Sequence, residues 1–299
     1  MKLKSLAQSL LQQNYEVTHS YHHLRLWLEG TQSSDKIIIY QMGKVGSTTI
    51  WDSLEALNLD IPIYHIHTLK PEIIQKAADK GRSDFPKLRF VYPEIVQSEY
   101  LRKQLDRNAI KTPWHVITLV RDPIAKTLSL FFQQLEQELL LGTDYRQKIK
   151  EEGQEAVLQK MIGRFHQEYI RNPDRKHPFY WINREIKDNL ALDIFAEPPL
   201  SDAGYRIYKA AAANILLLKL ESLSDCHQQA FQEFLGLQNF QLVQSNVGSQ
   251  KRYGSLYKAF LKQVDLPADY LEEIYGSKLV THFYSASEIE RFYQRWRTA

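Results

Sequence analysis

Residues 36–57, KIIIYQMGKVGSTTIWDSLEAL, constrain the fold more than any other part of the sequence. An apolar run at 37–40 precedes a loop with two glycines, Gly43 and Gly46, and apolar residues follow at helical spacing from Ile50 onward. The order strand, loop, helix turns backbone N–H groups and a helix N-terminus toward one point, which is a ready phosphate site. The simpler alternative is a strand-to-helix turn that binds no ligand.

The lysine of this loop stands in an unusual place. In the Walker pattern of nucleoside-triphosphate enzymes, lysine follows the last glycine and directly precedes a serine or threonine. Here Lys44 comes two positions before the second glycine, Gly46. The loop is therefore predicted to hold a phosphate in a different way from a Walker loop.

The composition is that of an ordinary globular protein, with 299 residues, 43% hydrophobic and 24% charged. Cys226 is the single cysteine, which rules out an intrachain disulfide and is consistent with a reducing compartment. No apolar run approaches the roughly 20 residues of a membrane span, and the N-terminus lacks the apolar core of a signal peptide. We therefore expect a cytoplasmic protein. The formal charge of +3 argues against general nucleic-acid binding but permits a local anion site.

Two parts of unequal size are expected along the chain. Residues 1–34 form a predicted helical appendage with an apolar face, ended by the polar residues 31–35. This face consists of Leu3, Leu6, Leu10 and Leu11. Packing on the domain or on a partner is its expected role, and association with a membrane surface is the alternative. Residues 35–299 form the predicted α/β domain.

Strand and helix patterns alternate through this domain. Beyond the first strand, apolar runs at 61–67, 114–120 and 215–220 predict strands, with helices near 71–80, near 94–108 and from Pro123. The alternation predicts a central parallel sheet flanked by helices on both faces, with a largely helical part from 222 to 299. Ligands of such sheets bind at the carboxyl ends of the strands. The glycine loop, two histidines and Arg121 are all predicted to lie there.

A second strand-to-helix joint carries polar residues of interest. Arg121 ends the strand at 114–120, and Ser129 lies about two turns into the next helix. The arginine fork and the serine hydroxyl so placed are suited to grip one phosphate from two sides. The alternative is that Arg121 pairs with a carboxylate and that Ser129 is an ordinary helix residue.

The histidines of Tyr64-His65-Ile66-His67 share one face of their predicted strand because side chains alternate with period two. A histidine near its ordinary pKa is suited to accept a proton at neutral pH. Two histidines at this spacing are also potential zinc ligands, but no third ligand is evident nearby. Histidines at the edge of the core are a further alternative.

Together, the lysine-containing Gly-x-x-Gly-Ser-Thr loop and the Arg-Asp-Pro segment with its later serine resemble the sulfotransferases. Those enzymes use 3′-phosphoadenosine 5′-phosphosulfate, and the resemblance implies a P-loop type of α/β fold, no required metal, and this nucleotide as cofactor. It implies that Arg121 and Ser129 hold the 3′-phosphate. It further implies a 5′-phosphosulfate loop consisting of Gly43, Lys44, Val45, Gly46, Ser47, Thr48 and Thr49.

Two narrower resemblances add roles. The Tyr-His-x-His segment is similar to that of the uronyl 2-O-sulfotransferases, which implies that His67 is the catalytic base, supported by His65, with Lys44 stabilising the leaving oxygen. Residues 36–297 resemble the bacterial capsular polysaccharide synthesis proteins, whose Asn…Lys-Trp-Tyr-Ser signature appears here as Asn246…Lys251-Arg252-Tyr253-Gly254. Lys251 and Arg252 are accordingly candidates for closing over the nucleotide, or else part of a solvated basic turn.

The acceptor implied by this second resemblance is the hydroxyl of a carbohydrate, such as a capsular or extracellular polysaccharide. Aromatic and basic residues between 142 and 210 either face an anionic sugar or pack as a helical cap, among them Arg164, Tyr169, Tyr180, Trp181 and Arg184. Two other functional classes remain open. One is a P-loop kinase with Asp122 as a metal ligand, and the other is a non-catalytic nucleotide-binding partner in polysaccharide assembly.

Overall fold

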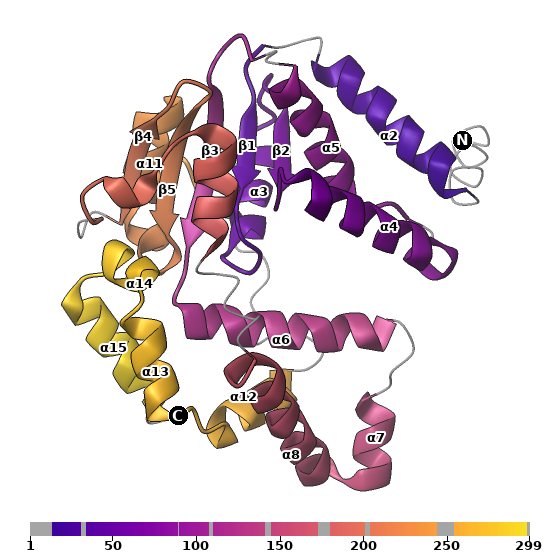
Figure 1. The fold of residues 1–299 in the computed structure, drawn as a ribbon, viewed down its shortest axis with the longest axis vertical. Coiled ribbons are helices and arrows are strands. Elements are labelled where there is room, and N and C mark those ends of the chain that lie inside the picture. The colour runs from indigo at the N-terminus through magenta and orange to yellow at the C-terminus, as the bar shows by residue number, and fades with distance from the viewer. Residues whose placement is uncertain are drawn as a thin grey trace.

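A five-stranded sheet forms the centre of the molecule in the computed structural model (Figure 1), which describes residues 14–30, 34–88, 90–107, 110–140, 145–172, 180–200, 204–243 and 254–297. The strand order is β2-β1-β3-β5-β4. The strands are β1 (Ile37–Tyr40), β2 (Ile63–Ile66), β3 (Trp114–Val120), β4 (Tyr205–Lys209) and β5 (Ala213–Lys219). The predicted α/β class with a central sheet is confirmed.

The four strands that the sequence predicted are parallel, and an additional strand that was not predicted, β4, makes one edge of the sheet antiparallel. β1 pairs in parallel with β2 and β3, and β3 pairs in parallel with β5. β4 pairs antiparallel with β5, with Lys209 opposite Asn214 across a short hairpin. The sequence of β4, YRIYK, has the mixed polarity of a partly exposed edge strand, so it lacks the apolar run that marks the buried strands.

Helices connect and surround the sheet. The N-terminal ones are α2 (Tyr15–Gly30), α3 (Ser47–Glu55), α4 (Pro71–Leu88), α5 (Pro93–Asp106) and α6 (Pro123–Leu140). The middle region contains α7 (Tyr145–Glu152), α8 (Gln154–Phe165), π-helical turns at His166–Ile170 and Ile182–Lys187, α10 (Asp188–Leu190) and a 3-10 turn at Ile194–Ala196. After a 3-10 turn at Leu220–Ser222 follow α11 (Leu223–Leu235), α12 (Gly254–Gln263), α13 (Ala268–Tyr275), α14 (Lys278–Phe283) and α15 (Ala286–Arg297).

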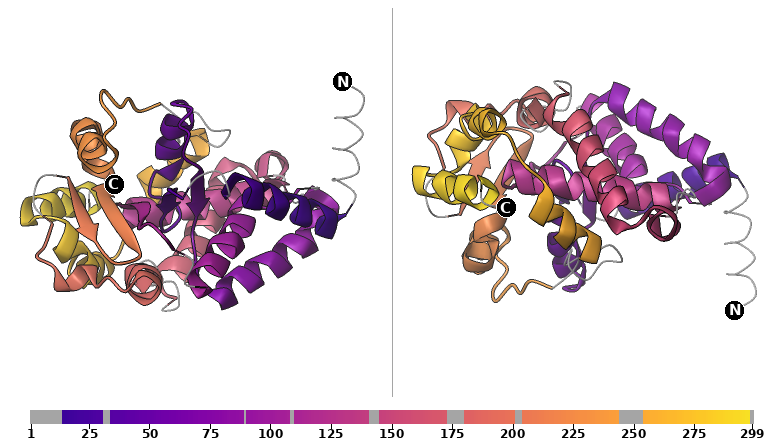
Figure 2. Two further views of the ribbon diagram at one scale, coloured as in Figure 1. Left: turned by 90° about the horizontal axis from the view of Figure 1, so that it is seen from above. Right: turned by 90° about the horizontal axis from the view of Figure 1, so that it is seen from below.

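Two groups of helices lie at opposite ends of the molecule. Figure 2 shows α2, α4 and α5 grouped at one end and α13, α14 and α15 at the other, in both views. The predicted largely helical C-terminal part is confirmed. Both predicted helices after the second strand exist, although α4 extends well beyond residue 80 and continues through Pro86. Leu3, Leu6, Leu10 and Leu11 lie outside the described residues, so their predicted apolar face stays a prediction.

The core is built around the strands that the apolar runs predicted. All four residues of β1 are buried, as are most residues of β3 and β5. α6 begins directly after β3, and it runs across the end of the sheet at which the parallel strands stop (Figure 1). This placement brings α6 opposite the glycine loop. Among the described helices, none is long and apolar enough to cross a membrane.

Candidate functional site

The loop between β1 and α3 has the backbone of an anion cradle. Lys44 and Gly46 adopt left-handed conformations with φ of 70° and 93°, and Gly46 is the N-cap residue of α3. Gly46 has no side chain, so the N-cap residue itself makes no capping hydrogen bond to the first N–H groups of α3. A Cβ on Gly46 would lie 2.5 Å from Leu220 Cδ1, whereas a Cβ on Gly43 would meet nothing within 4 Å. Gly46 therefore serves the backbone turn, and Gly43 leaves one side of the loop open.

Arg121 supports this loop from the end of β3. Its Nη1 donates a hydrogen bond to the Lys44 carbonyl oxygen at 3.0 Å, which joins the two predicted phosphate motifs directly. Burial lowers the pKa of Arg121, and the nearby carboxylate of Glu221 opposes that effect. Ser129 is partly buried on α6. The structure thus unites Arg121 with the loop, while the predicted grip on one phosphate by Arg121 and Ser129 stays a prediction.

Asp122 does not have the surroundings of a metal ligand. Its Oδ1 accepts hydrogen bonds from the Ile124 N–H at 3.0 Å and from the Tyr275 hydroxyl at 2.9 Å. Its Oδ2 accepts one from Trp296 Nε1 at 2.7 Å, and the side chain is 1% exposed. Both carboxylate oxygens are therefore used to begin α6 and to attach the C-terminal helices. The kinase alternative, which needed Asp122 beside a metal, is not supported at this residue.

His67 lies one residue beyond β2, and its orientation is fixed by the backbone of the glycine loop. Its Nδ1 is 3.0 Å from the Gln41 carbonyl oxygen. A carbonyl only accepts hydrogen bonds, so Nδ1 carries the proton and Nε2 is the basic nitrogen of the neutral ring. The Trp181 indole Nε1 donates to the His67 carbonyl oxygen at 2.9 Å and holds this residue from the other side. The arrangement is that of a positioned proton acceptor.

His65 is a partly buried neighbour of His67, as their shared strand face predicted. The two ring centroids are 5.1 Å apart, and the His65 ring also stacks on Trp51 at 5.8 Å. Burial, with a smaller effect of His67, lowers the pKa of His65 to about 3, so this ring is neutral at physiological pH. Among the described residues, no third metal ligand joins this pair, which leaves the zinc alternative without support here.

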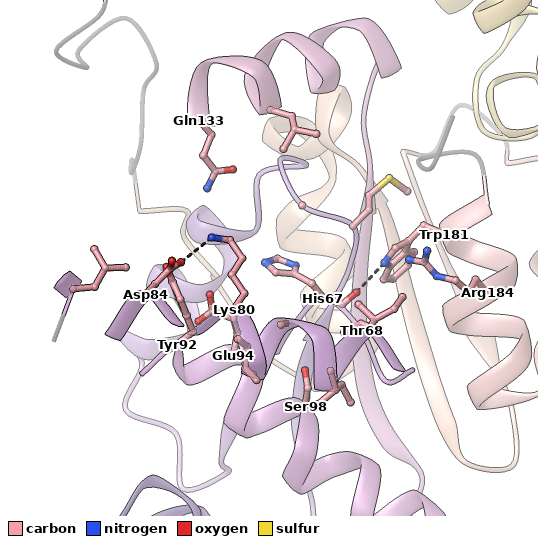
Figure 3. A pocket seen from close by; sticks show the side chains of 18 of the residues that line it. His67, Thr68, Lys80, Asp84, Tyr92, Glu94, Ser98, Gln133, Trp181 and Arg184 are labelled. Carbon is pink, nitrogen blue, oxygen red and sulfur yellow. Dashed lines mark hydrogen bonds and ion pairs between the residues drawn. The ribbon is translucent and has the colours of Figure 1, made fainter. Parts of the chain in front are cut away.

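A cavity of about 690 Å³ opens beside the loop and His67. Met42, Gly43, His67 and Thr68 line it at the strand ends, and α4, α5 and α6 form its long walls. Figure 3 shows the His67 ring inside this cavity, between Lys80 of α4 and Trp181. Much of the wall is apolar, including Ile73, Ile74, Ala77, Ile95 and Leu130. The helical walls also carry polar side chains, among them Lys80, Asp84, Glu94 and Gln133, so the cavity combines polar strand ends with walls of mixed character.

Lys126 is a site residue that the sequence reasoning missed. It lies on the buried face of α6, is 6% exposed, and lines the same cavity as Gly43 and His67. Burial and, to a smaller extent, the charge of Arg121 lower the pKa of Lys126 to about 8. Among the described residues, none accepts a hydrogen bond from its ammonium group. The signal for Lys126 in the sequence was its place between Ala125 and Leu128, which lie on the apolar face of a predicted helix.

Glu185 links the chain segments beside the cavity at the strand ends. This fully buried carboxylate accepts hydrogen bonds from the Tyr40 hydroxyl at 2.6 Å, the Thr68 hydroxyl at 3.0 Å and the Leu69 N–H at 2.9 Å. Arg184, which lines the cavity, donates to it at 2.9 Å. One carboxylate therefore fixes the end of β1 and the segment after β2 relative to each other.

The other predicted contact residues divide between packing and the cavity. Arg164 pairs with Glu138 and Glu168, and Tyr169 is buried, so these two belong to the helical cap. Trp181 and Arg184 line the cavity, whereas Tyr180 is 63% exposed.

Lys251 and Arg252 lie outside the described residues, and their nucleotide contact stays a prediction. On the N-terminal side, the Val243 N–H donates to Ser53 Oγ of α3 at 2.8 Å. On the C-terminal side, Tyr257 of α12 stacks edge-on against Phe132 of α6. The flanking residues are therefore attached to the two helices that follow the predicted phosphate motifs.

One protein family matches part of the chain. Residues 155–285 fit the model of the family described as "Putative capsular polysaccharide synthesis protein". No curated protein and no solved structure matches. The matched region includes Trp181 and Glu185 but not the glycine loop or His67, so it is narrower than the resemblance over residues 36–297. Residues 155–285 are thus similar to this capsular polysaccharide synthesis family.

Proposed function

We propose that the protein is a sulfotransferase that moves a sulfuryl group from 3′-phosphoadenosine 5′-phosphosulfate to an acceptor hydroxyl in the cavity beside His67. The observation that carries the proposal is the largely buried side chain of Lys126, which lines the same cavity as Gly43 of the loop. A buried cation without a carboxylate partner is costly, and a bound anion removes that cost. A site built for an anion explains why the lysine is there.

The residues present fit a nucleotide of this kind. Its phosphosulfate end needs N–H donors and cations; the first turn of α3 offers the N–H groups, Lys126 of the cavity offers one cation, and Lys44 is the proposed second cation. Arg121 lies directly behind the loop, at the Lys44 carbonyl, as the proposed ligand of a second phosphate. Bound there, the nucleotide supplies the transferable sulfuryl group, and Gly43 leaves room for its close approach.

His67 is the proposed base. Its Nε2 accepts the proton of the acceptor hydroxyl while the acceptor oxygen forms its bond to sulfur. The bond between sulfur and the bridging phosphate oxygen breaks, and the cations of the site stabilise the charge that develops on that oxygen. Because Gln41 holds the Nδ1–H, the ring presents the correct nitrogen without rearrangement. His65, held neutral by burial, adds no charge that would repel a proton from His67.

The walls of the cavity narrow the proposed class of acceptor. A bare, fully hydroxylated sugar would leave Ile74, Ile95 and Leu130 in contact with polar groups. A hydroxyl acceptor with an apolar portion matches this lining better. Its apolar part covers the apolar wall residues while its hydroxyl reaches His67. Together with the similarity of residues 155–285 to a capsular polysaccharide synthesis family, this favours a lipid-linked sugar as acceptor.

Nucleotide binding is the first test. We expect adenosine 3′,5′-bisphosphate to bind the wild-type protein in calorimetry without added metal, and Arg121→Lys and Lys126→Met to weaken that binding by at least about tenfold, since one charge-assisted hydrogen bond is worth about 1.5–3 kcal/mol. Lys80→Met is the matched control, because Lys80 lines the same cavity but pairs with Asp84 at the surface. Binding of ATP with magnesium, and none of the bisphosphate, would refute the proposal.

Transfer itself is the second test. Radiolabelled sulfate from the nucleotide should appear on a lipid-linked oligosaccharide, and less of it on the same oligosaccharide without lipid. His67→Ala should abolish turnover while nucleotide affinity remains, because His67 acts on the acceptor proton. If His67→Ala turns over at the wild-type rate, the base assignment is wrong, and equal transfer to both oligosaccharides contradicts the proposed acceptor class alone.

A further inference from the structure

Three potential metal ligands lie together where α2 contacts α5: His19 and His23 of α2, and Glu99 of α5. His19 and His23 are four residues apart on α2 and therefore project from the same face of the helix. Their Nε2 atoms lie 2.9 Å and 2.6 Å from one oxygen, Oε2 of Glu99 on α5. The ligand atoms of all three residues lie within 4.8 Å of one another. None of these residues contributes to the cavity beside His67.

We propose that His19, His23 and Glu99 form a zinc-binding site that fastens α2 to the α/β domain. Two imidazoles and one carboxylate form a known zinc ligand set, which leaves a fourth position for water. With ligands at about 2.0–2.2 Å from zinc, tetrahedral geometry needs ligand atoms roughly 3.3 Å apart. The two histidine–carboxylate separations, 2.9 Å and 2.6 Å, need to open by less than about 1 Å, which side-chain rotation supplies.

The partly buried position of the cluster suits a metal site. The three side chains are 18–21% exposed, so a metal ion has a route from solvent but few competing water ligands. The His19 and His23 ring centroids are 4.8 Å apart, and the His19 ring also stacks on Tyr15 at 5.6 Å.

The packing of α2 indicates what a bound metal would contribute. α2 buries only Tyr15, Thr18 and Leu26, which is a small apolar contact for a helix of 16 residues. Several large apolar residues of α2, including Leu24 and Trp27, are exposed. The histidine and glutamate cluster links α2 to α5, while Glu16 of α2 pairs with Arg82 of α4. Zinc would convert that link into a stable attachment.

Zinc titration of the full-length, untagged protein tests the site. After treatment with a chelator, we expect calorimetry at pH 7.5 to show one zinc ion per chain. The variant His19→Ala/His23→Ala should bind at least about 100-fold more weakly, since even outer-shell partners change metal affinity by about 10–100-fold. His22→Ala is the matched control, because His22 lies on the same helix, contacts Tyr21 and is outside the cluster. It should bind zinc like the wild type.

Two further measurements distinguish a loss of zinc binding from a loss of folding. Glu99→Gln keeps an acceptor for both histidines but lacks the charge, so it should retain the wild-type far-ultraviolet circular dichroism and still bind zinc more weakly. Cobalt added to the wild-type protein should give the visible absorption of a four-coordinate site, and zinc should displace it. Zinc affinity that is the same in the wild type, the double variant and Glu99→Gln overturns the proposal, as does a wild type that binds no zinc.

Discussion

Replacement of Lys126 by methionine should make the ligand-free protein more stable while it impairs binding of the nucleotide. Burial lowers the pKa of Lys126 from its ordinary 10.5 to about 8. At pH 7 the lysine is protonated in the folded and unfolded chains, and the folded chain bears the whole cost of a buried charge. A shift of this size corresponds to about 3 kcal/mol, since one pKa unit is about 1.4 kcal/mol.

Methionine has a similar length and no charge, so it keeps most of the packing on α6. A volume-conserving exchange of this type costs less than about 1.5 kcal/mol, so a net gain of about 2 kcal/mol in the free energy of unfolding is expected at pH 7. The gain depends on pH in a defined direction. Above pH 8 the folded-state lysine loses its proton and the cost declines, so by about pH 9.5 the penalty falls to about 1.4 kcal/mol and the gain nearly disappears.

Urea unfolding of the wild type and of Lys126→Met at pH 7 and at about pH 9.5 measures this gain. Lys80→Met is the control, because Lys80 is exposed and its pair with Asp84 is worth at most about 1 kcal/mol. Adenosine 3′,5′-bisphosphate added at pH 7 should raise the stability of the wild type more than that of Lys126→Met. A variant that is less stable than the wild type at pH 7, by an amount that does not change with pH, would refute the reasoning that a buried, uncompensated charge stands at this site.

Three other predictions follow from the site. His65 has a folded-state pKa of about 3, so as the pH falls below 6.5 the unfolded chain binds a proton at this residue before the folded chain does. Acidification from pH 7 to pH 5 should therefore lower the free energy of unfolding of the wild type by about 2 kcal/mol, and His65→Gln should not show this loss. Gly46→Ala should lower the melting temperature because of its φ of 93° and the contact with Leu220, whereas Gly43→Ala should leave it unchanged and weaken nucleotide binding. Asp122→Asn should cost about 3 kcal/mol in urea unfolding and alter tryptophan fluorescence, because an amide N–H₂ replaces an acceptor of the buried Trp296 donor.

The parts of the fold that the sequence predicts are those with a local signal. β1, β3 and β5 are continuous apolar runs, and the glycines of the loop mark the strand-to-helix turn after β1. β4 has no such signal, since its position at the edge depends on pairing with β5 rather than on its own residues. The presence of strands and helices was therefore predictable, whereas the antiparallel edge was not.

The same distinction, between features with a local sequence signal and features that depend on distant elements, applies to the site residues. The glycine spacing and the histidines His65 and His67 are visible in the sequence, and the approach of Gly43 and His67 to one cavity follows from the parallel sheet. Lys126 and Glu185 were not predicted, because a charged residue on a helix is usually exposed, and their burial depends on elements far away in the chain. For the zinc cluster, the spacing of His19 and His23 is visible, but Glu99 lies 76 residues beyond His23 on another helix.

The two halves of the chain depend on each other at the cavity. The glycine loop, His67 and Lys126 come from the N-terminal half, whereas residues 155–285 carry the similarity to the capsular polysaccharide synthesis family. From that second half, Trp181 holds the His67 backbone and Glu185 ties the end of β1 to the segment after β2. Glu221 accepts from the Asp122 N–H and stands near Arg121. The matched region therefore positions the proposed chemistry without supplying its reacting groups, so an isolated fragment of residues 155–285 should neither bind the nucleotide nor transfer sulfate.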